Sequence, residues 1–99
     1  MTVAELKVSA RQDKAPPAKL TLSGQALWWL WRGDWDAAHQ IAQDMENAEG
    51  AWLHALVHLY EGDVSNAHYW FHQADRPAMG LTQKEKTWEQ IAAHVKLSS

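Results

Sequence analysis

The sequence contains no cysteine, which excludes disulfide bonds and any metal site built on thiolates. It also has no apolar run near the roughly 20 residues that a membrane-spanning helix needs. Residues 1–6 lack the basic-then-apolar plan of a secretory signal peptide, so we expect a cytoplasmic protein without a membrane partner. β-Branched residues are scarce and alternation of apolar and polar residues is absent, which argues against strands.

Basic residues are too few and too dispersed for a nucleic-acid-binding protein. The chain carries 9 lysines and arginines against 12 acidic residues, and no segment gathers its cations on one face. It also lacks a glycine-rich phosphate-binding loop and any serine in a Gly-x-Ser-x-Gly context. The composition therefore predicts neither an enzyme nor a cofactor, and it argues against nucleic acid as a partner.

Tryptophan, in contrast, is abundant, with seven among 99 residues. Rings of this size fill the space between helices, but seven exceed what a core this small needs. Trp28, Trp29 and Trp31 span too wide an arc of one helix to face the same way. We therefore expect at least one ring outside the core, and exposed aromatic residues are typical of protein interfaces.

The chain repeats itself at an offset of 29 residues. Residues 23–45 and 52–74 share seven identities, in which apolar residues three or four apart precede a Gly-Asp pair and then an Ala-His pair. In the first copy the identical positions are Ala26, Leu27, Leu30, Gly33, Asp34, Ala38 and His39. Duplication of so short a unit is typical of stacked helical hairpins, each of which buries one face on the next.

Local signals predict five helices. We expect them over residues 22–31, 35–45, 51–60, 64–74 and 83–95. Gly33 ends the first helix, because glycine adopts a positive φ freely, and Asp34 caps the second. The same pair recurs as Gly62 and Asp63 between the third and fourth helices, so both hairpins are expected to turn in the same way.

These elements predict an all-α fold of two tandem antiparallel hairpins and a C-terminal capping helix. The hairpins are expected at 22–46 and 51–75, the capping helix at 82–96 and the single helical domain at 21–97. Thr82 and Glu85 are expected to form a capping box at the start of the last helix. Residues 1–20 show no clear helical period and contain Pro16 and Pro17, so we expect an extended or loosely ordered arm. Within it, residues 4–8 could form a short strand or a turn of helix.

The second copy resembles a tetratricopeptide repeat. Its first helix carries Trp52, the pair Ala55 and Leu56, and Leu59 at the places of that repeat's Trp, Leu-Gly pair and Tyr. Its second helix carries Ala67, Phe71 and Ala74 where the family has Ala, Phe and Ala, and the first copy matches there with Ala38, Ala42 and Met45. The unit is 29 residues long here and about 34 in the family. The resemblance implies a right-handed stack of hairpins.

A second resemblance covers the run from His54 to Trp70. Together with the Arg76-Pro77 pair that follows, this run is similar to a group of small bacterial proteins to which no activity is assigned. It supports the helical fold and indicates nothing about chemistry.

The tetratricopeptide resemblance implies a groove lined by the first helix of each hairpin. Residue by residue, it places Trp28, Trp31, Arg32, Leu53, Val57 and Tyr60 in that groove. We expect a binding or scaffold module whose aromatic groove takes a protein or peptide partner. Self-association is an alternative, and so is internal filling of the groove by the arm or by the last helix.

Histidines form the second candidate site. His54 and His58 are four residues apart on one predicted helix, as are His68 and His72 on the next, and this spacing places each pair on one helix face. A four-histidine metal site would make the chain a small metal-dependent or acid–base enzyme, the alternative to a binding module. The other interpretation is surface or half-buried imidazoles that are hydrogen-bonded to the backbones of neighbouring helices. His39 and His68 are equivalent in the duplication, which favours a structural task for both.

Overall fold

The structure, a computed structural model, describes all 99 residues and is built from helices. In chain order these are α1 (Val3–Gln12), α2 (Leu22–Arg32), α3 (Trp35–Asp44), α4 (Ala48–Tyr60), α5 (Val64–Gln73), the short 3₁₀ helix η1 (Leu81–Gln83) and α6 (Lys84–His94). Strand-like pairing is limited to one isolated bridge between Leu20 and Ser98. The predicted all-α class is confirmed. None of the helices combines the length and the apolar character that crossing a membrane requires.

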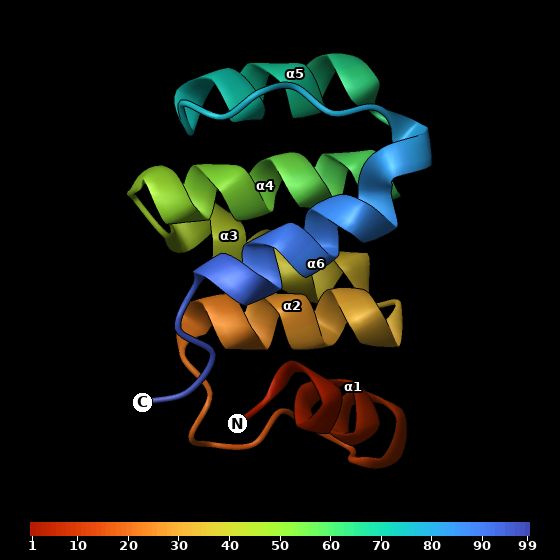
Figure 1. The fold of residues 1–99 in the computed structure, drawn as a ribbon, viewed down its shortest axis with the longest axis vertical. Coiled ribbons are helices and arrows are strands. Elements are labelled where there is room, and N and C mark those ends of the chain that lie inside the picture. Colours follow the sequence, from red (N-terminus) through yellow and green to blue (C-terminus); the bar gives the residue numbers. More distant parts are fainter.

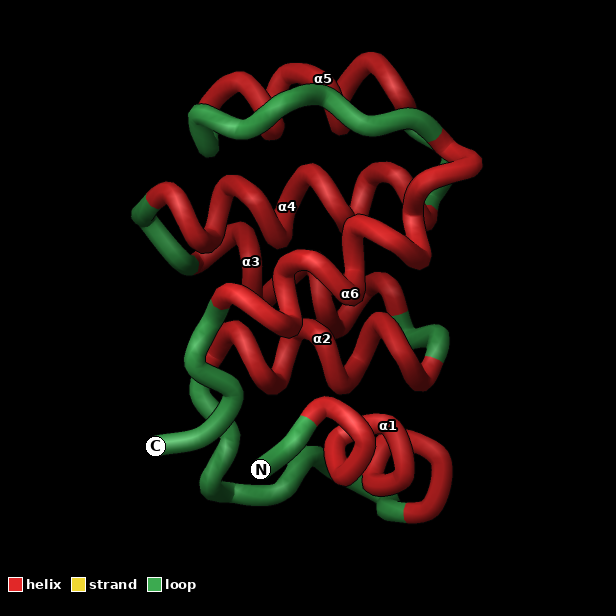
Figure 2. The backbone as a smooth tube through the Cα atoms, viewed as in Figure 1, coloured by secondary structure: helices red, strands yellow, loops and turns green.

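The helices form a stack with one helix laid across it. From α1 to α5 each helix packs against the next, and α6 lies across α2 and α4 (Figure 1). Helix α1 is at one end of the stack and α5 at the other, and both chain termini lie near α1 (Figure 2). Because α6 contacts both α2 and α4, it covers the side of the stack that these two helices share.

The two Gly-Asp turns have the predicted geometry. Gly33 and Gly62 adopt positive φ angles of 95° and 81°. The carboxylates of Asp34 and Asp63 accept hydrogen bonds from backbone amides in the first turns of α3 and α5. One residue pair therefore ends one helix and begins the next at both corners of the stack.

Three helix starts differ from the sequence expectation, and the start of α4 at Ala48 in place of residue 51 is one of them. Residues 3–12 form α1 where an extended or loosely ordered arm is expected, because Thr2 and Glu5 form a capping box and Leu6 is fully buried. At the other end of the chain, α6 begins after η1, and the Gln83 side chain accepts from the Gly80 amide at 2.9 Å. The expected capping box of Thr82 and Glu85 is therefore not formed.

One core joins all the layers. Its largest fully buried side chains are Trp28, Trp88, Phe71, Leu6, Leu27, Leu53, Leu56, Leu59 and Ile91. Leu27 and Leu56, which are equivalent in the duplication, are both completely shielded from solvent. The same holds for Ala38 and Ala67, so these two pairs of equivalent positions are buried to the same extent.

Candidate functional site

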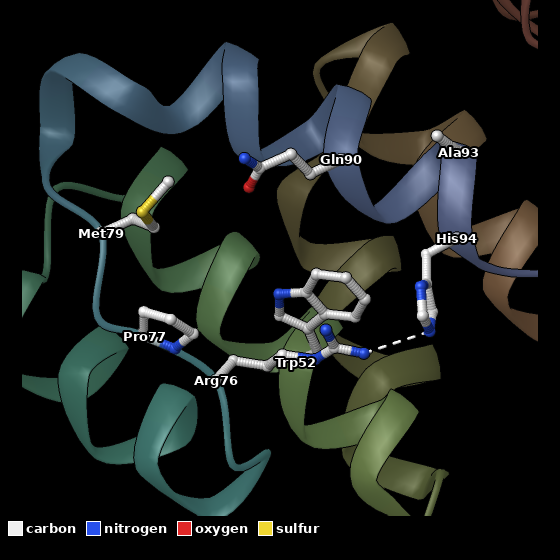
Figure 3. A pocket seen from close by; sticks show the side chains of 7 residues that line it. All are labelled: Trp52, Arg76, Pro77, Met79, Gln90, Ala93 and His94. Atoms are coloured by element: carbon white, nitrogen blue, oxygen red, sulfur yellow. Dashed lines mark hydrogen bonds between the residues drawn. The ribbon is translucent and has the colours of Figure 1, made fainter.

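A cleft of about 500 Å³ opens between α4, α6 and the segment that follows α5 (Figure 3). It is lined by Trp52, Arg76, Pro77, Met79, Gln90, Ala93 and His94. Trp52 comes from α4, and its indole is almost completely covered, with 7% of the residue exposed. The cleft therefore has a buried aromatic surface at its base and both polar and apolar side chains from two other elements around it.

Arg76 gives the cleft its charge. Its guanidinium carbon lies 3.9 Å from the centre of the Trp52 ring, a cation–π contact. Its Nη2 lies 3.1 Å from Nε2 of His94, and because arginine only donates, His94 accepts at that nitrogen (Figure 3). No carboxylate lies within ion-pair distance of Arg76, so its positive charge is not neutralised within the chain.

The end of α5 fixes the position of Arg76. The Asp75 amide donates to the His72 carbonyl and the Arg76 amide donates to the Phe71 carbonyl, both at 3.0 Å. These two hydrogen bonds together form a Schellman motif, in which Asp75 adopts the left-handed conformation with a φ of 58°. Pro77 follows immediately and cannot continue the helix. Arg76 is thus held by backbone hydrogen bonds at the point where the chain leaves α5.

Of the six residues expected to line a partner groove, three are inside the core. Trp28, Leu53 and Val57 are fully buried. The indole nitrogen of Trp28 donates to the Ser9 hydroxyl on α1, and α6 packs on α2 and α4. The chain's own first and last helices fill the space where a partner was expected, which is one of the alternatives that the sequence left open.

The other three groove residues lie together on the surface. Trp31, Arg32 and Tyr60 line a second hollow of about 630 Å³ between α1, α2, α4 and α6. Arg32 donates to backbone carbonyls of α1 and of the turn after it, and Lys7 Nζ lies 4.5 Å from the centre of the Trp31 ring. The cationic groups of Arg32 and Lys7 are therefore already engaged in contacts within the chain.

Tyr60 is the titratable group most affected by its position in this hollow. Burial raises its pKa to about 12, and the nearby carboxylates of Glu85 and Glu89 add to the effect. Its hydroxyl therefore stays protonated at neutral pH and is a hydrogen-bond donor at the edge of the hollow.

The structure brings together a different set of histidines from the expected one. His54 and His58 on α4 face His39 on α3, and the ligand atoms of these three residues all lie within 4.8 Å of one another. His68 and His72 are exposed on α5 and do not join them. His39 and His68 are equivalent in sequence, but α4 packs against α3 at His39, whereas His68 faces solvent at the end of the stack.

Stacking fixes the imidazoles on α4. The His54 ring lies parallel to the Trp70 indole, with 3.9 Å between the ring centres, and nearly parallel to the His58 ring, with 4.9 Å between the ring centres. The His39 ring stands perpendicular to His54, and the two Nε2 atoms are 3.0 Å apart. One of these nitrogens must be unprotonated for a hydrogen bond to form. The rings of Trp70, His54 and His58 therefore form a short stack, and His39 forms a hydrogen bond with His54 from the side of that stack.

Two further properties set this histidine group apart. Burial, followed by the neighbouring His39 and His58, lowers the pKa of His54 to about 4. The Nδ1 atom of His58 is buried and has no hydrogen-bond partner, because the Glu61 carboxylate, 3.1 Å away, lies outside hydrogen-bonding geometry. An unpaired buried nitrogen is uncommon in a folded protein and calls for an explanation.

Sequence reasoning missed Arg76 and His39 as site residues. The cleft depends on how α6 returns across α4, and no local pattern contains that information. His39 meets His54 only because of the crossing of α3 on α4. The duplication gives His39 the same place in its hairpin as His68, but it does not indicate that His39 meets His54.

Comparisons with known proteins supply no relative: the chain matches no family model, no curated protein and no solved structure.

Proposed function

We propose that this chain is a protein-binding module of two stacked tetratricopeptide-like hairpins, and that its Trp52–Arg76 cleft takes an acidic peptide segment of a partner. The hairpins are α2 with α3 and α4 with α5, and α6 is the capping helix. The similar burial of Leu27 and Leu56 and the identical Gly-Asp turns support the tandem arrangement. Trp52 belongs to the first helix of its hairpin, the element that lines the binding groove in the family the chain resembles.

The uncompensated guanidinium of Arg76 is the observation that carries this proposal. It lies on an aromatic ring, has a histidine on one side and faces no carboxylate of its own chain. A planar guanidinium binds a carboxylate through two parallel hydrogen bonds. Met79 and Pro77 supply apolar contact area beside it. The matching ligand is a segment in which an Asp or Glu adjoins an apolar side chain, and Trp and Arg are the residue types that dominate binding energy in interfaces.

The test is an NMR titration with a short acetylated peptide of alternating Glu and Leu. We expect amide shifts to change at Ala93 and Gln90 and the indole signal of Trp52 to move. Arg76→Gln should weaken binding about tenfold or more, because a hydrogen bond between charged groups is lost. Arg11→Gln is the matched control, since it removes the same charge from the other hollow and should leave the affinity unchanged.

Three results would contradict the proposal. The first is a peptide of alternating Lys and Leu binding as well as the acidic one. The second is undiminished binding by Arg76→Gln. The third is sedimentation showing a dimer that Arg76→Gln dissociates, because a second copy of the chain would then occupy the cleft.

A further inference from the structure

We propose that His39, His54 and His58 form a binding site for a divalent transition-metal ion, and that zinc is the ion it fits. The site lies between α3 and α4, away from the Trp52–Arg76 cleft, so it does not depend on the proposed peptide binding. Its three imidazoles come from two helices that pack directly against each other.

Distances between the nitrogens suit a metal ion. Two histidine nitrogens bound to tetrahedral zinc at about 2.0–2.1 Å lie about 3.3 Å apart. The Nε2 atoms of His39 and His54 are 3.0 Å apart, and all three ligand atoms lie within 4.8 Å of one another. The His39–His54 pair is therefore close to the spacing that zinc requires, whereas nitrogens as far as 4.8 Å apart must approach by about 1.5 Å, and the ion would replace the hydrogen bond between the two rings.

The rings are already oriented. His54 is packed flat on Trp70 at 3.9 Å, and His58 is stacked on His54 one helical turn further along α4. Because packing fixes these rings before the ion arrives, little conformational entropy is lost on binding. His54 is only 6% exposed, so protein atoms surround its ring on most sides.

The unpaired nitrogen of His58 also points to a missing ligand. Its Nδ1 lies 3.1 Å from a carboxylate oxygen of Glu61 but outside hydrogen-bonding geometry, and its side chain is only 13% exposed. A metal ion removes this deficit by either route. If Nδ1 binds the ion, the nitrogen is satisfied directly. If Nε2 binds it, a small rotation lets Nδ1 donate to Glu61, the carboxylate contact that orients histidine ligands at many zinc sites.

The ligand set selects the class of metal. Three imidazoles without thiolate suit zinc, copper and nickel and do not suit magnesium or calcium, which require oxygen ligands. With three protein ligands, tetrahedral zinc keeps its fourth position for water or an added ligand. His39 is only partly buried, so the group is not fully closed to solvent.

The experiment is calorimetric titration of the tag-free, metal-stripped full chain with zinc chloride, repeated with cobalt(II) to record its visible spectrum. We expect one ion per chain with micromolar or tighter affinity, and a cobalt spectrum of the intense four-coordinate type. His39→Gln and His58→Gln should each weaken zinc binding more than about tenfold, since even outer-shell changes cost that much. The double variant His68→Gln with His72→Gln is the matched control, because it removes an exposed pair of the same spacing.

The result is decisive in each direction. Absence of zinc binding by the unmodified chain overturns the proposal, as does undiminished binding by His39→Gln. Loss of binding in the His68 and His72 double variant also overturns it, because the ion would then lie on α5. His39 is partly exposed, so its variant is expected to fold even if His54→Gln does not, and circular dichroism checks this.

Discussion

The indole nitrogen of Trp28 donates a hydrogen bond to the hydroxyl of Ser9, 3.0 Å away, and both residues are buried between α1 and α2. Ser9 in turn donates to the Asp13 carboxylate just beyond the end of α1, at 2.5 Å. These two bonds connect the first helix to the most deeply buried tryptophan of the second. They explain how ten residues that would be a marginal helix alone remain helical here.

Ser9→Ala should therefore destabilise the fold. It removes the acceptor of a buried indole N–H, and we expect a loss of about 1–3 kcal/mol in the free energy of unfolding. Urea denaturation followed by helical circular dichroism measures it. Val8→Ala, on the exposed side of the same helix, is the control and should change the midpoint very little. An unchanged midpoint for Ser9→Ala would show that the hydrogen bond contributes nothing.

Gly24→Ala should destabilise the protein, although alanine favours helices by about 1 kcal/mol over glycine. A Cβ at residue 24 would lie 2.3 Å from the carbonyl oxygen of Leu97, which is backbone and cannot rotate away. The C-terminal segment must shift, and the bond from the Thr21 amide to that carbonyl is weakened. We expect a net loss of about 1–3 kcal/mol by thermal unfolding.

Leu22→Ala, an exposed change on the same helix, is the reference for Gly24→Ala and should cost less than about 0.5 kcal/mol. A rise in melting temperature for Gly24→Ala would mean that helix propensity outweighs the contact with Leu97.

Asp75→Gly should stabilise the protein by about 0.5–1 kcal/mol. Asp75 occupies the left-handed region with a φ of 58°, which an L-residue adopts at a cost of about 1–2 kcal/mol, partly offset by the greater freedom of glycine in the unfolded chain. Differential scanning calorimetry gives the change. Gly33→Ala is the opposite test, because it forces an alanine to adopt a φ of 95°. No atom lies within 4 Å of the added Cβ, so the backbone strain alone should destabilise the folded protein. Equal melting temperatures for all three proteins would contradict this account of the turns.

Ionisation of Tyr60 should destabilise the fold at high pH. The pKa of Tyr60 is about 12 in the folded protein and 10 when the fold is lost, so the unfolded chain releases this proton at the lower pH. The protonated hydroxyl therefore contributes stability below pH 10, and this contribution is lost as the pH rises from 10 to 12. In a Tyr69→Phe background Tyr60 is the only tyrosine, and its absorbance change should come near pH 12. A midpoint near 10 would show that Tyr60 is freely solvated.

The helices from α2 to α5 could be predicted because their signals are local. Gly33 and Asp34 end one helix and begin the next through bonds that span only a few residues. Helix α1 was expected as at most one turn over residues 4–8, although its capping box of Thr2 and Glu5 can be read in the sequence, because a short helix followed by two prolines depends on packing against α2. The start of α4 at Ala48 has a local cause, since the Asn47 side chain accepts a hydrogen bond from the Gly50 amide and caps the helix earlier than expected.

The candidate sites were only partly accessible to sequence reasoning. His54 and His58 could be singled out because four-residue spacing places them on one face of α4. Their actual neighbour, His39, is set by the crossing of α3 on α4, and no spacing rule relates residue 39 to residue 54. The burial of Trp28 depends likewise on α1, a helix the sequence analysis did not expect at its full length. Long-range packing, rather than local propensity, decides which side chains share a site.

The flat stacking of His54 on Trp70 has a magnetic consequence. Circulating electrons of the indole shield protons held above its face, so the His54 ring protons should resonate well upfield of ordinary imidazole positions. That displaced pair of signals is a built-in spectroscopic marker for the contact between α4 and α5. The upfield displacement disappears as soon as those two helices separate, even if each one remains helical.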